Sequence, residues 1–234
     1  MGCPASLPAH APGKPRVLDV CCCQGGATRG YQLAGFRVTG VDITDQPRYV
    51  GEEFHQADAL EFLHTCREQI RRDYVFVHAS PPCQHDSDTQ RLRGNDHPDL
   101  IAPIRDALDA IGLPYVIENV KGALPKLRNP IMLCGTMFAL ATYRHRYFET
   151  GGGFTFTPPE HPVHLAPQAK MGRPVPPGSY GQFIGNFSGV SLARQVMGMP
   201  WANRDGLREA IPPAYTRHIG QALRARLDAR REAA

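Results

Sequence analysis

The chain of 234 residues predicts an α/β fold with a mostly parallel, doubly wound sheet. Two observations lead to this prediction. Short runs of strand length alternate with longer segments of helical periodicity over the first half of the chain. The runs 74–77 and 114–117 are also almost wholly apolar, as strands buried between two layers of helices are. The length allows one sizeable α/β domain with a modest appendage.

The first half of the chain is expected to contain four strands and three helices. A helix is clearest over 98–111, where Leu100, Ile101, Ile104, Leu108 and Ile111 recur at helical spacing. The expected order is a strand over 16–20, a turn at 24–26, a helix through Tyr31 and Leu33, a strand over 35–42, a short connector over 55–59, a helix over 59–72, a strand over 74–77, the helix over 98–111 and a strand that reaches Glu118.

The second half of the chain changes character. Residues 130–150 read as β-rich, 151–190 are dominated by proline and glycine, and 191–199 and 215–231 carry helical patterns. We therefore divide the chain into an N-terminal extension (1–15), an α/β domain (16–150), a short Pro/Gly-rich region (151–190) and C-terminal helices (191–234), the last of which returns to the α/β domain.

The composition sets limits on partners and location. The formal charge of +4 is a mild basic excess, which is compatible with nucleic acid but does not prove it. No apolar run approaches the roughly 18 residues of a membrane span, so we expect no membrane partner. No signal peptide is visible, so we expect a reducing cytoplasm. The consecutive cysteines 21–23 cannot easily converge on one metal, and His161 and His164 have no second pair at zinc-ligand spacing. No metal site is predicted.

Two strand ends carry side chains that can take part in catalysis. Ser80-Pro81-Pro82-Cys83-Gln84 follows one apolar run, and Glu118-Asn119-Val120 ends the next. Strand ends at one edge of a doubly wound sheet are where such folds place their chemistry. A thiol on one strand end and a carboxyl on the next are a nucleophile and an acid that can act on one ring, the pairing used in methylation of cytosine at C5.

The first strand ends in a glycine-containing turn suited to a nucleoside. Small residues in the stretch from Asp19 to Gly26 allow backbone N–H groups to approach a ligand at a helix N-terminus. The turn lacks the spacing of a dinucleotide fingerprint. Asp42, at the end of the second strand, is placed to accept ribose hydroxyls, and Asp58 could reach an adenine edge. S-adenosylmethionine fits this pattern; a plain tight turn and a solvated strand end are the alternative.

These motifs, in this order, resemble the DNA (cytosine-5)-methyltransferase family, in particular its short phage-type members. The stretch from Asp19 to Gly26 resembles the cofactor loop, Pro82-Cys83-Gln84 the nucleophile motif, Glu118-Asn119-Val120 the acid motif and Arg144-His145-Arg146 the arginine motif. Residues 191–200 resemble the helix that supports target recognition, and 209–213 the closing cofactor motif. The segment between Arg146 and Ser191, where family members carry their target recognition domain, is much shorter here than is usual in the family.

The resemblance implies a Rossmann-like fold of the S-adenosylmethionine-dependent methyltransferases, with 16–150 as its catalytic domain and 151–190 as a reduced target-recognition region. It implies a monomer that acts on duplex DNA with the target cytosine flipped out. A bacterial host, a phage genome as the source and a role in restriction-modification would follow. The implied cofactor contacts are Asp19, Cys21, Cys23, Gln24, Gly25, Gly26, Asp42, Ile43, Asp58, Ala59, Pro82, Leu100, Glu209 and Ala210.

The implied catalytic residues have separate roles. Cys83 would add to C6 of cytosine, and Glu118 would hold N3 and the N4 amine. Arg144 and Arg146, which share one face of a strand-like run, would contact the base and its phosphate. Contacts to the substrate are also expected from Gln84, Asn119, Arg91 and Arg93.

Each assignment has an alternative. Cys83 could be an inert buried thiol, Glu118 a structural ion-pair partner, and the two arginines ordinary surface charges. The short recognition region leaves RNA, single strands or free cytosine nucleotides as substrates. A non-catalytic DNA-binding or regulatory protein on the same fold is a third hypothesis, disfavoured because a binding module needs no thiol at position 83.

Overall fold

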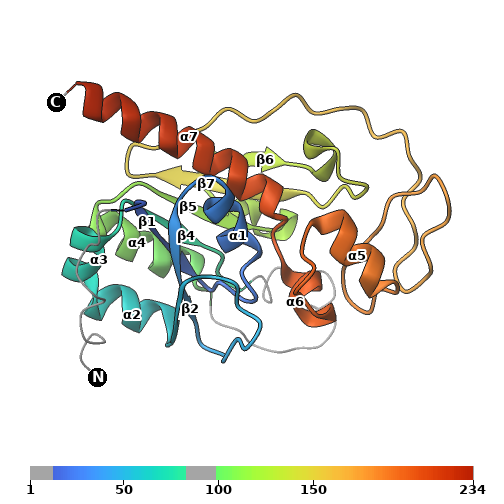
Figure 1. Ribbon diagram of the computed structural model, residues 1–234, viewed down its shortest axis with the longest axis horizontal. Coiled ribbons are helices and arrows are strands. Elements are labelled where there is room, and N and C mark those ends of the chain that lie inside the picture. Colours follow the sequence, from blue (N-terminus) through green and yellow to red (C-terminus); the bar gives the residue numbers. More distant parts are fainter. Residues whose placement is uncertain (1–12, 83–98, 234) are drawn as a thin grey trace.

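The computed structural model describes residues 13–82 and 99–233 as a seven-stranded sheet with helices on both faces (Figure 1). The strand order is β3-β2-β1-β4-β5-β7-β6. The strands are β1 (Arg16–Val20), β2 (Arg37–Asp42), β3 (Glu53–Gln56), β4 (Phe76–Ala79), β5 (Tyr115–Asn119), β6 (Ile131–Leu133) and β7 (Arg146–Gly151). The first five strands of that order are parallel, and β7 runs antiparallel to both β5 and β6.

Five of the seven helices in the described part of the chain cover the two faces of the sheet. The seven are α1 (Gly26–Leu33), α2 (Ala59–Thr65), α3 (Arg67–Asp73), α4 (Ile101–Ile111), α5 (Val190–Met197), α6 (Arg204–Glu209) and α7 (Pro213–Glu232), with short 3₁₀ turns η1 (Lys121–Lys126) and η2 (Gly135–Phe138). Apolar side chains of α2, α3 and α4 pack on one face, and those of α1 and α7 pack on the other. The mostly parallel α/β architecture predicted from the sequence is confirmed.

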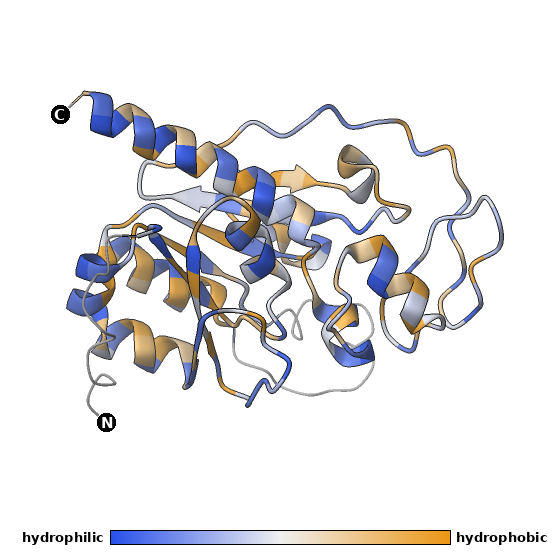
Figure 2. Cartoon of the chain, in the orientation of Figure 1, coloured by the Kyte–Doolittle hydropathy of each residue, from blue (hydrophilic) through white to orange (hydrophobic). Residues whose placement is uncertain are grey.

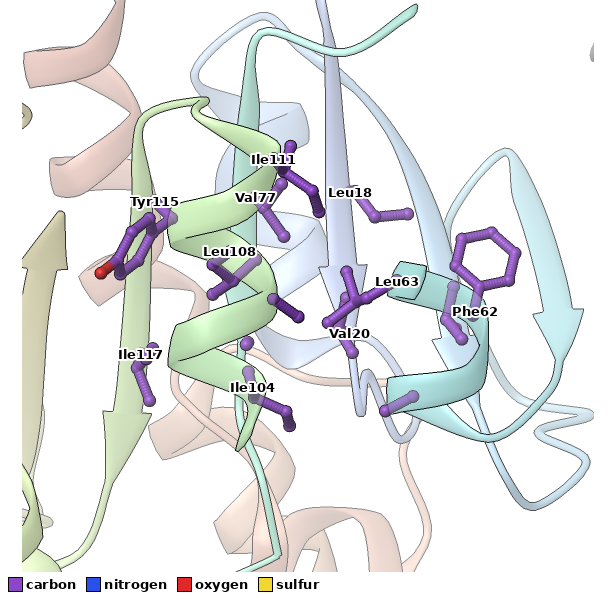
Figure 3. Packing of buried hydrophobic residues seen from close by; sticks show 14 of the residues in the cluster. Leu18, Val20, Phe62, Leu63, Val77, Ile104, Leu108, Ile111, Tyr115 and Ile117 are labelled. Atoms are coloured by element: carbon purple, nitrogen blue, oxygen red, sulfur yellow. The ribbon is translucent and has the colours of Figure 1, made fainter. Parts of the chain in front are cut away.

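Successive side chains of each strand point to opposite faces of the sheet, which gives one apolar core on each face. Leu18 and Val20 of β1 pack against α2 and α4, together with Val77 of β4 and Ile117 of β5 (Figure 3). Val17, one position earlier, lies in the other core with Tyr31 of α1 and Ile219 of α7. Burial of both faces accounts for the nearly continuous apolar runs that mark these strands in the sequence. Figure 2 shows the resulting pattern, with apolar residues of the helices turned toward the sheet and charged residues outward.

Three element predictions need correction. The connector expected at 55–59 begins as an edge strand, β3, that pairs with β2. The single helix expected over 59–72 is divided into α2 and α3 at Cys66. The helix α6 was not predicted at all; its start is capped by Asn203, whose side chain accepts a hydrogen bond from Gly206 N.

The Pro/Gly-rich region is irregular, as expected. Between β7 and α5 the chain runs as a long path without helices, drawn in gold and orange in Figure 1. Its backbone pairing consists of a bridge between Gln168 and Tyr180, a hydrogen bond from Gly181 N to Ala141 O and scattered turn hydrogen bonds. A third apolar cluster joins its end to α5 and α6 through Phe183, Phe187, Met197 and Leu207. None of the helices in 13–82 and 99–233 has the length and apolar character needed to span a bilayer.

Candidate active site

The carboxyl ends of β1, β2, β4 and β5 and the start of the antiparallel β7 meet at one edge of the sheet. Asp19 of β1 is in register with His78 of β4, and His78 with Val116 of β5. Because side chains alternate along a strand, Asp19, His78 and Glu118 point to the same face, the one covered by α1 and α7. The edge predicted to carry the chemistry therefore brings together polar side chains from three neighbouring strands.

Glu118 forms an ion pair with Arg146. Arg146 Nε lies 2.8 Å from Glu118 Oε1, and both side chains are about nine-tenths buried or more. The N–H does not point at the oxygen, so Oε1 has no hydrogen-bond partner among the described residues. Burial raises the pKa of Glu118, and the positive charges of Arg146 and Arg144 and a hydrogen bond from Ser80 lower it in part. The result is a buried carboxyl with an oxygen available to a ligand.

A hydrogen-bond chain behind Glu118 was not predicted from the sequence. The hydroxyl of Tyr31 lies 3.0 Å from His78 Nδ1, and His78 Nε2 lies 2.9 Å from the hydroxyl of Ser80, which in turn bonds to Glu118. His78 is completely buried, and this burial lowers its pKa to about 3, so the imidazole is neutral. A histidine within an apolar strand, two residues before Ser80, was the signal available in the sequence.

Asn119 positions the end of the β4 segment. Its side-chain amide donates to Pro81 O at 3.0 Å, and its own oxygen accepts from Val120 N at 2.9 Å. This links the chain entering Pro82 to the end of β5. Cys83, the predicted nucleophile, and Gln84, Arg91 and Arg93, the predicted substrate contacts, lie outside the described residues.

Arg144 and Arg146 differ in their surroundings. The guanidinium of Arg144 donates to four main-chain carbonyls, those of Phe183, Leu207, Arg208 and Ala210, at 2.7–3.1 Å. Arg144 has positive φ (24°), and its own carbonyl accepts a hydrogen bond from the Tyr215 hydroxyl. Arg144 therefore connects the start of β7 to the segment from 183 to 210, whereas Arg146 faces the carboxyl of Glu118.

The turn between β1 and α1 is shaped by residues with positive φ. Cys21 and Cys23 have φ of 59° and 46°, and Gly25, the N-cap of α1, has φ of 82°. Asp42 fixes this turn, since one oxygen accepts from Cys23 N at 2.9 Å and the other from Thr44 N at 3.0 Å. Burial and the charge of Glu209 raise the pKa of Cys23 to about 12. Burial also raises the pKa of Cys21 and Cys22, so all three thiols favour the protonated form.

A pocket opens between this turn and the C-terminal segment. Its lining includes Asp19, Ser80, Met199, Glu209 and the cysteines 21–23. Asp19 is fully buried; Thr28 donates to its Oδ2 at 2.5 Å, but Oδ1 has no hydrogen-bond partner among the described residues. Burial raises the pKa of Asp19 to about 7. A buried oxygen in need of a donor suits a ligand with an ammonium group.

Gln24 seals one end of the pocket. Its side-chain amide donates to Asn203 Oδ1 at 2.8 Å and accepts from Asn203 N at 3.0 Å. Trp201 Nε1 donates to the Gln24 carbonyl at 2.8 Å. Gly26 must lack a side chain, because a Cβ there would overlap the carbonyl of Ile211. The first turn and the C-terminal segment thus form one wall.

The remaining predicted cofactor contacts fall into two groups. Asp42, Ile43, Asp58 and Pro82 are at least partly exposed around the carboxyl edge, whereas Ala59 and Ala210 are buried and Leu100 is half-buried against the α2–α4 core. Asp58 is also the N-cap of α2, since its carboxylate accepts from Glu61 N at 2.9 Å. Glu209 Oε2 lies 3.9 Å from Cys23 Sγ at the pocket rim.

Comparison with solved structures identifies the fold. The chain is similar to an Escherichia coli protein described as a candidate DNA modification methyltransferase encoded within a prophage, with a TM-score of 0.61 and 14% identity over 92% of this chain and 100% of that one. It is also similar to the Entamoeba histolytica methyltransferase EhMeth, with a TM-score of 0.56 and 12% identity over 92% and 99%. No family model matches the sequence, and no curated protein matches it.

The protein has the Rossmann-like fold of S-adenosylmethionine-dependent methyltransferases. Both matches extend over nearly the whole length of the solved chains, so the fold includes the sheet, the irregular region and the C-terminal helices rather than the nucleotide-binding half alone. At 12–14% identity the likeness concerns the fold. Substrate and reaction must be argued from the site.

Proposed function

We propose that the protein is a methyltransferase that uses S-adenosylmethionine to methylate C5 of cytosine in DNA. The observation that carries the proposal is the Glu118–Arg146 pair, buried at the sheet edge where Asn119 also holds Pro81, two residues before Cys83. An acid and a thiol from neighbouring strand ends are what the chemistry requires.

The residues present fit the cofactor. The methionine part of S-adenosylmethionine carries an ammonium group that can donate to Asp19 Oδ1, the buried oxygen that lacks a donor. Asp42 lies at the end of β2, where nucleoside-binding folds place a ribose acceptor. When bound, the cofactor supplies a methyl group on an electron-poor sulfonium sulfur.

Cytosine C5 needs activation before it can accept that methyl. The Cys83 thiolate would add to C6, forming an S–C6 bond and moving the C5–C6 π electrons toward C5. C5 could then accept the methyl group that the cofactor would supply, which would leave as S-adenosylhomocysteine. A base would remove the C5 proton, and the C5–C6 double bond would reform as Cys83 leaves as thiolate. Every bond made to the enzyme is broken, so the thiol is regenerated.

Glu118 would stabilise the electron-rich adduct. Burial raises its pKa while Arg146 and Arg144 lower it in part, so this carboxyl takes up a proton more readily than an exposed one and could donate it to N3 of the base. Negative charge develops on the pyrimidine as the sulfur adds, so this hydrogen bond strengthens in the transition state. Arg146 keeps the carboxyl in place at 2.8 Å and supplies positive charge beside the same ring.

A trapping experiment tests the proposal. DNA containing 5-fluorocytosine has fluorine where the proton must leave C5, so the methylated adduct cannot be released. Incubation with S-adenosylmethionine should give a covalent protein–DNA species that survives denaturation and is absent for Cys83→Ser. Failure of the wild-type protein to form it, while methyl transfer to ordinary duplex DNA is measurable, would reject the cysteine mechanism; transfer only to free nucleotide or RNA would reject the DNA substrate.

A further inference from the structure

Four metal-ligating side chains from three separate segments meet beside the active site. Cys134 follows β6, His145 immediately precedes β7, and His161 and His164 lie in the irregular path between β7 and α5. One ligand atom from each of the four lies within 4.8 Å of the others. Spacing in the sequence predicts no metal site because only His161 and His164 are near neighbours; the fold brings their segment together with Cys134 and His145.

The ligand atoms lie nearly close enough together to surround one ion. Cys134 Sγ lies 3.3 Å from His164 Nε2, and His161 Nε2 lies 3.0 Å from His164 Nε2. A tetrahedral zinc with ordinary Zn–S and Zn–N bonds places its ligand atoms about 3.3 to 3.6 Å apart. The widest separation in the cluster, at most 4.8 Å, exceeds that by about a bond length. Small side-chain rotations would complete a tetrahedron.

Neighbouring groups hold the ligands in place. Tyr143 stacks on the His164 ring, with centroids 3.7 Å apart and planes at 20°, and its hydroxyl donates to Ala166 O at 2.5 Å. The hydroxyl of Thr136 lies 3.1 Å from Cys134 Sγ, close enough to donate to a thiolate. Such outer groups orient ligands and tune the sulfur in metal sites.

We propose that Cys134, His145, His161 and His164 bind one structural Zn²⁺. One soft sulfur and three imidazole nitrogens in a tetrahedral arrangement suit zinc, a borderline-soft ion without a redox step. Four protein ligands leave no open position for a water or substrate, so the ion has a structural role. The Cys134 thiol, which donates to Tyr143 O at 3.0 Å, would lose its proton to solvent on binding zinc.

The ion would fix the irregular region to the sheet. The path between β7 and α5 has few backbone hydrogen bonds of its own, and zinc would tie residues 161 and 164 to the loops that flank β6 and β7. His145 is adjacent to Arg146, so the tether would also set the distance between that path and Glu118. The metal site rests on the side-chain geometry alone; its part in presenting a target-recognition segment rests on the proposed function.

Metal analysis of the full-length, tag-free protein tests the site. After reconstitution with zinc and removal of loosely bound ion, elemental analysis should find about one zinc per chain. Cys134→Ser and His161→Ala should reduce this to near zero, whereas His64→Ala, which removes an exposed histidine on α2, should leave it unchanged. His161 is exposed, so its substitution should not impair folding.

Several results would overturn the proposal. The first is a wild-type protein that does not retain zinc. The second is zinc retained by Cys134→Ser and His161→Ala, bound instead by the cysteines at 21–23. The third is a different metal bound by the same four ligands. A second readout does not depend on variants: cobalt in place of zinc should give an S-to-Co charge-transfer band and the strong visible bands of a tetrahedral site, both absent without Cys134. Zinc content is measured without methyl transfer, so its outcome is independent of the proposed activity.

Limited proteolysis tests the tether. Lys170, six residues after His164, is an exposed trypsin site in the irregular path. Removal of zinc with a chelator should speed cleavage there by at least about tenfold, since a released segment opens more readily. The same treatment of His161→Ala should have no further effect. An equal cleavage rate with and without zinc in the wild-type protein would exclude the tethering role.

Discussion

Arg144 and Arg146 share one short stretch of sequence but face different groups. Arg144 satisfies four carbonyls from the C-terminal half of the chain, and Arg146 pairs with Glu118. A lysine can keep the charge at either position but cannot reproduce the planar set of guanidinium donors. The two substitutions should therefore have separable effects.

We predict that Arg144→Lys lowers the free energy of unfolding by about 3 kcal/mol, since several charged hydrogen bonds to buried carbonyls are lost. Arg146→Lys should change stability by less and reduce the rate of methyl transfer by about 10²-fold, because the charge next to Glu118 is displaced from the reacting ring. Chemical denaturation and single-turnover transfer of a labelled methyl group measure the two quantities. Equal losses of rate and stability in both variants would contradict this division of roles.

The raised pKa of the Asp19 carboxyl predicts how cofactor affinity depends on pH. Burial raises its pKa from 3.8 to about 7, so below pH 7 the carboxyl is mostly protonated in the free protein. A bound ammonium group favours the ionised form, and binding must then displace a proton. The dissociation constant of S-adenosylmethionine should fall as pH rises toward 7, by up to about tenfold per pH unit, and level off above it.

The variant Asp19→Asn is the control for this profile. It has no titrating carboxyl at the site, so its binding should be weaker at pH 8 and nearly independent of pH between 5 and 8. Calorimetric titration at fixed ionic strength measures both profiles. A wild-type profile as flat as that of Asp19→Asn would show that the carboxyl does not meet the cofactor ammonium.

At the scale of elements, the sequence predicts the strands that are buried on both faces and misses the short or exposed elements. The strands β4 and β5 are enclosed by helices on both faces and leave apolar runs that can be recognised. The edge strand β3 consists of Glu53, Phe54, His55 and Gln56, a mixed stretch with only one neighbour, and it leaves no such run. The helix α6 is short and polar and begins with a local cap, so its periodicity is too weak to detect.

The contact between α1 and α7 depends on one small residue. Gly30 is buried in α1, and a Cβ at this position would overlap the Thr216 side chain and the Pro213 carbonyl of α7. Thr216 also donates to the carbonyl of Ala27 at 2.8 Å, which keeps the two helices close.

We predict that Gly30→Ala lowers the free energy of unfolding by about 2 kcal/mol, although alanine is the better helix former, because overpacking outweighs the gain in propensity. Arg29→Ala, an exposed change in the same helix, should alter stability by less than about 0.5 kcal/mol. Equilibrium urea denaturation of the three proteins measures the difference. A Gly30→Ala protein as stable as the wild type would mean that α7 can shift away from α1 at little cost.

At the scale of the whole molecule, the site is assembled from both ends of the chain. Motif order in the sequence predicts that Asp19, Asp42, Glu118 and Arg146 converge, because parallel strands place their ends on one edge. It does not predict that Gln24 would bond to Asn203, or Arg144 to the carbonyls around Leu207, since those contacts need the C-terminal segment to return across the fold. The cluster of Cys134 with three histidines also could not be predicted, because its segments are distant in the sequence and meet only in the fold.

The contacts between the first turn and the C-terminal segment predict that cofactor binding stabilises both. Gly206 and residues 209–211 line one wall of the pocket. Their segment is bound to the first turn, because Trp201 Nε1 donates to Gln24 O and Glu209 contacts Cys23 Sγ. A ligand that binds only the form in which these contacts are made stabilises that form by mass action, by about 2.7 kcal/mol at a concentration of about 100 Kd.

S-adenosylhomocysteine at that level should slow hydrogen exchange in 19–26 and in 201–210 together, by up to about 100-fold where local opening controls exchange. Exchange in α3, which lies on the other face of the sheet, should stay unchanged. If only 19–26 were protected, Glu209 and Ala210 would not belong to the cofactor site, and the C-terminal segment would close the fold without closing on the ligand.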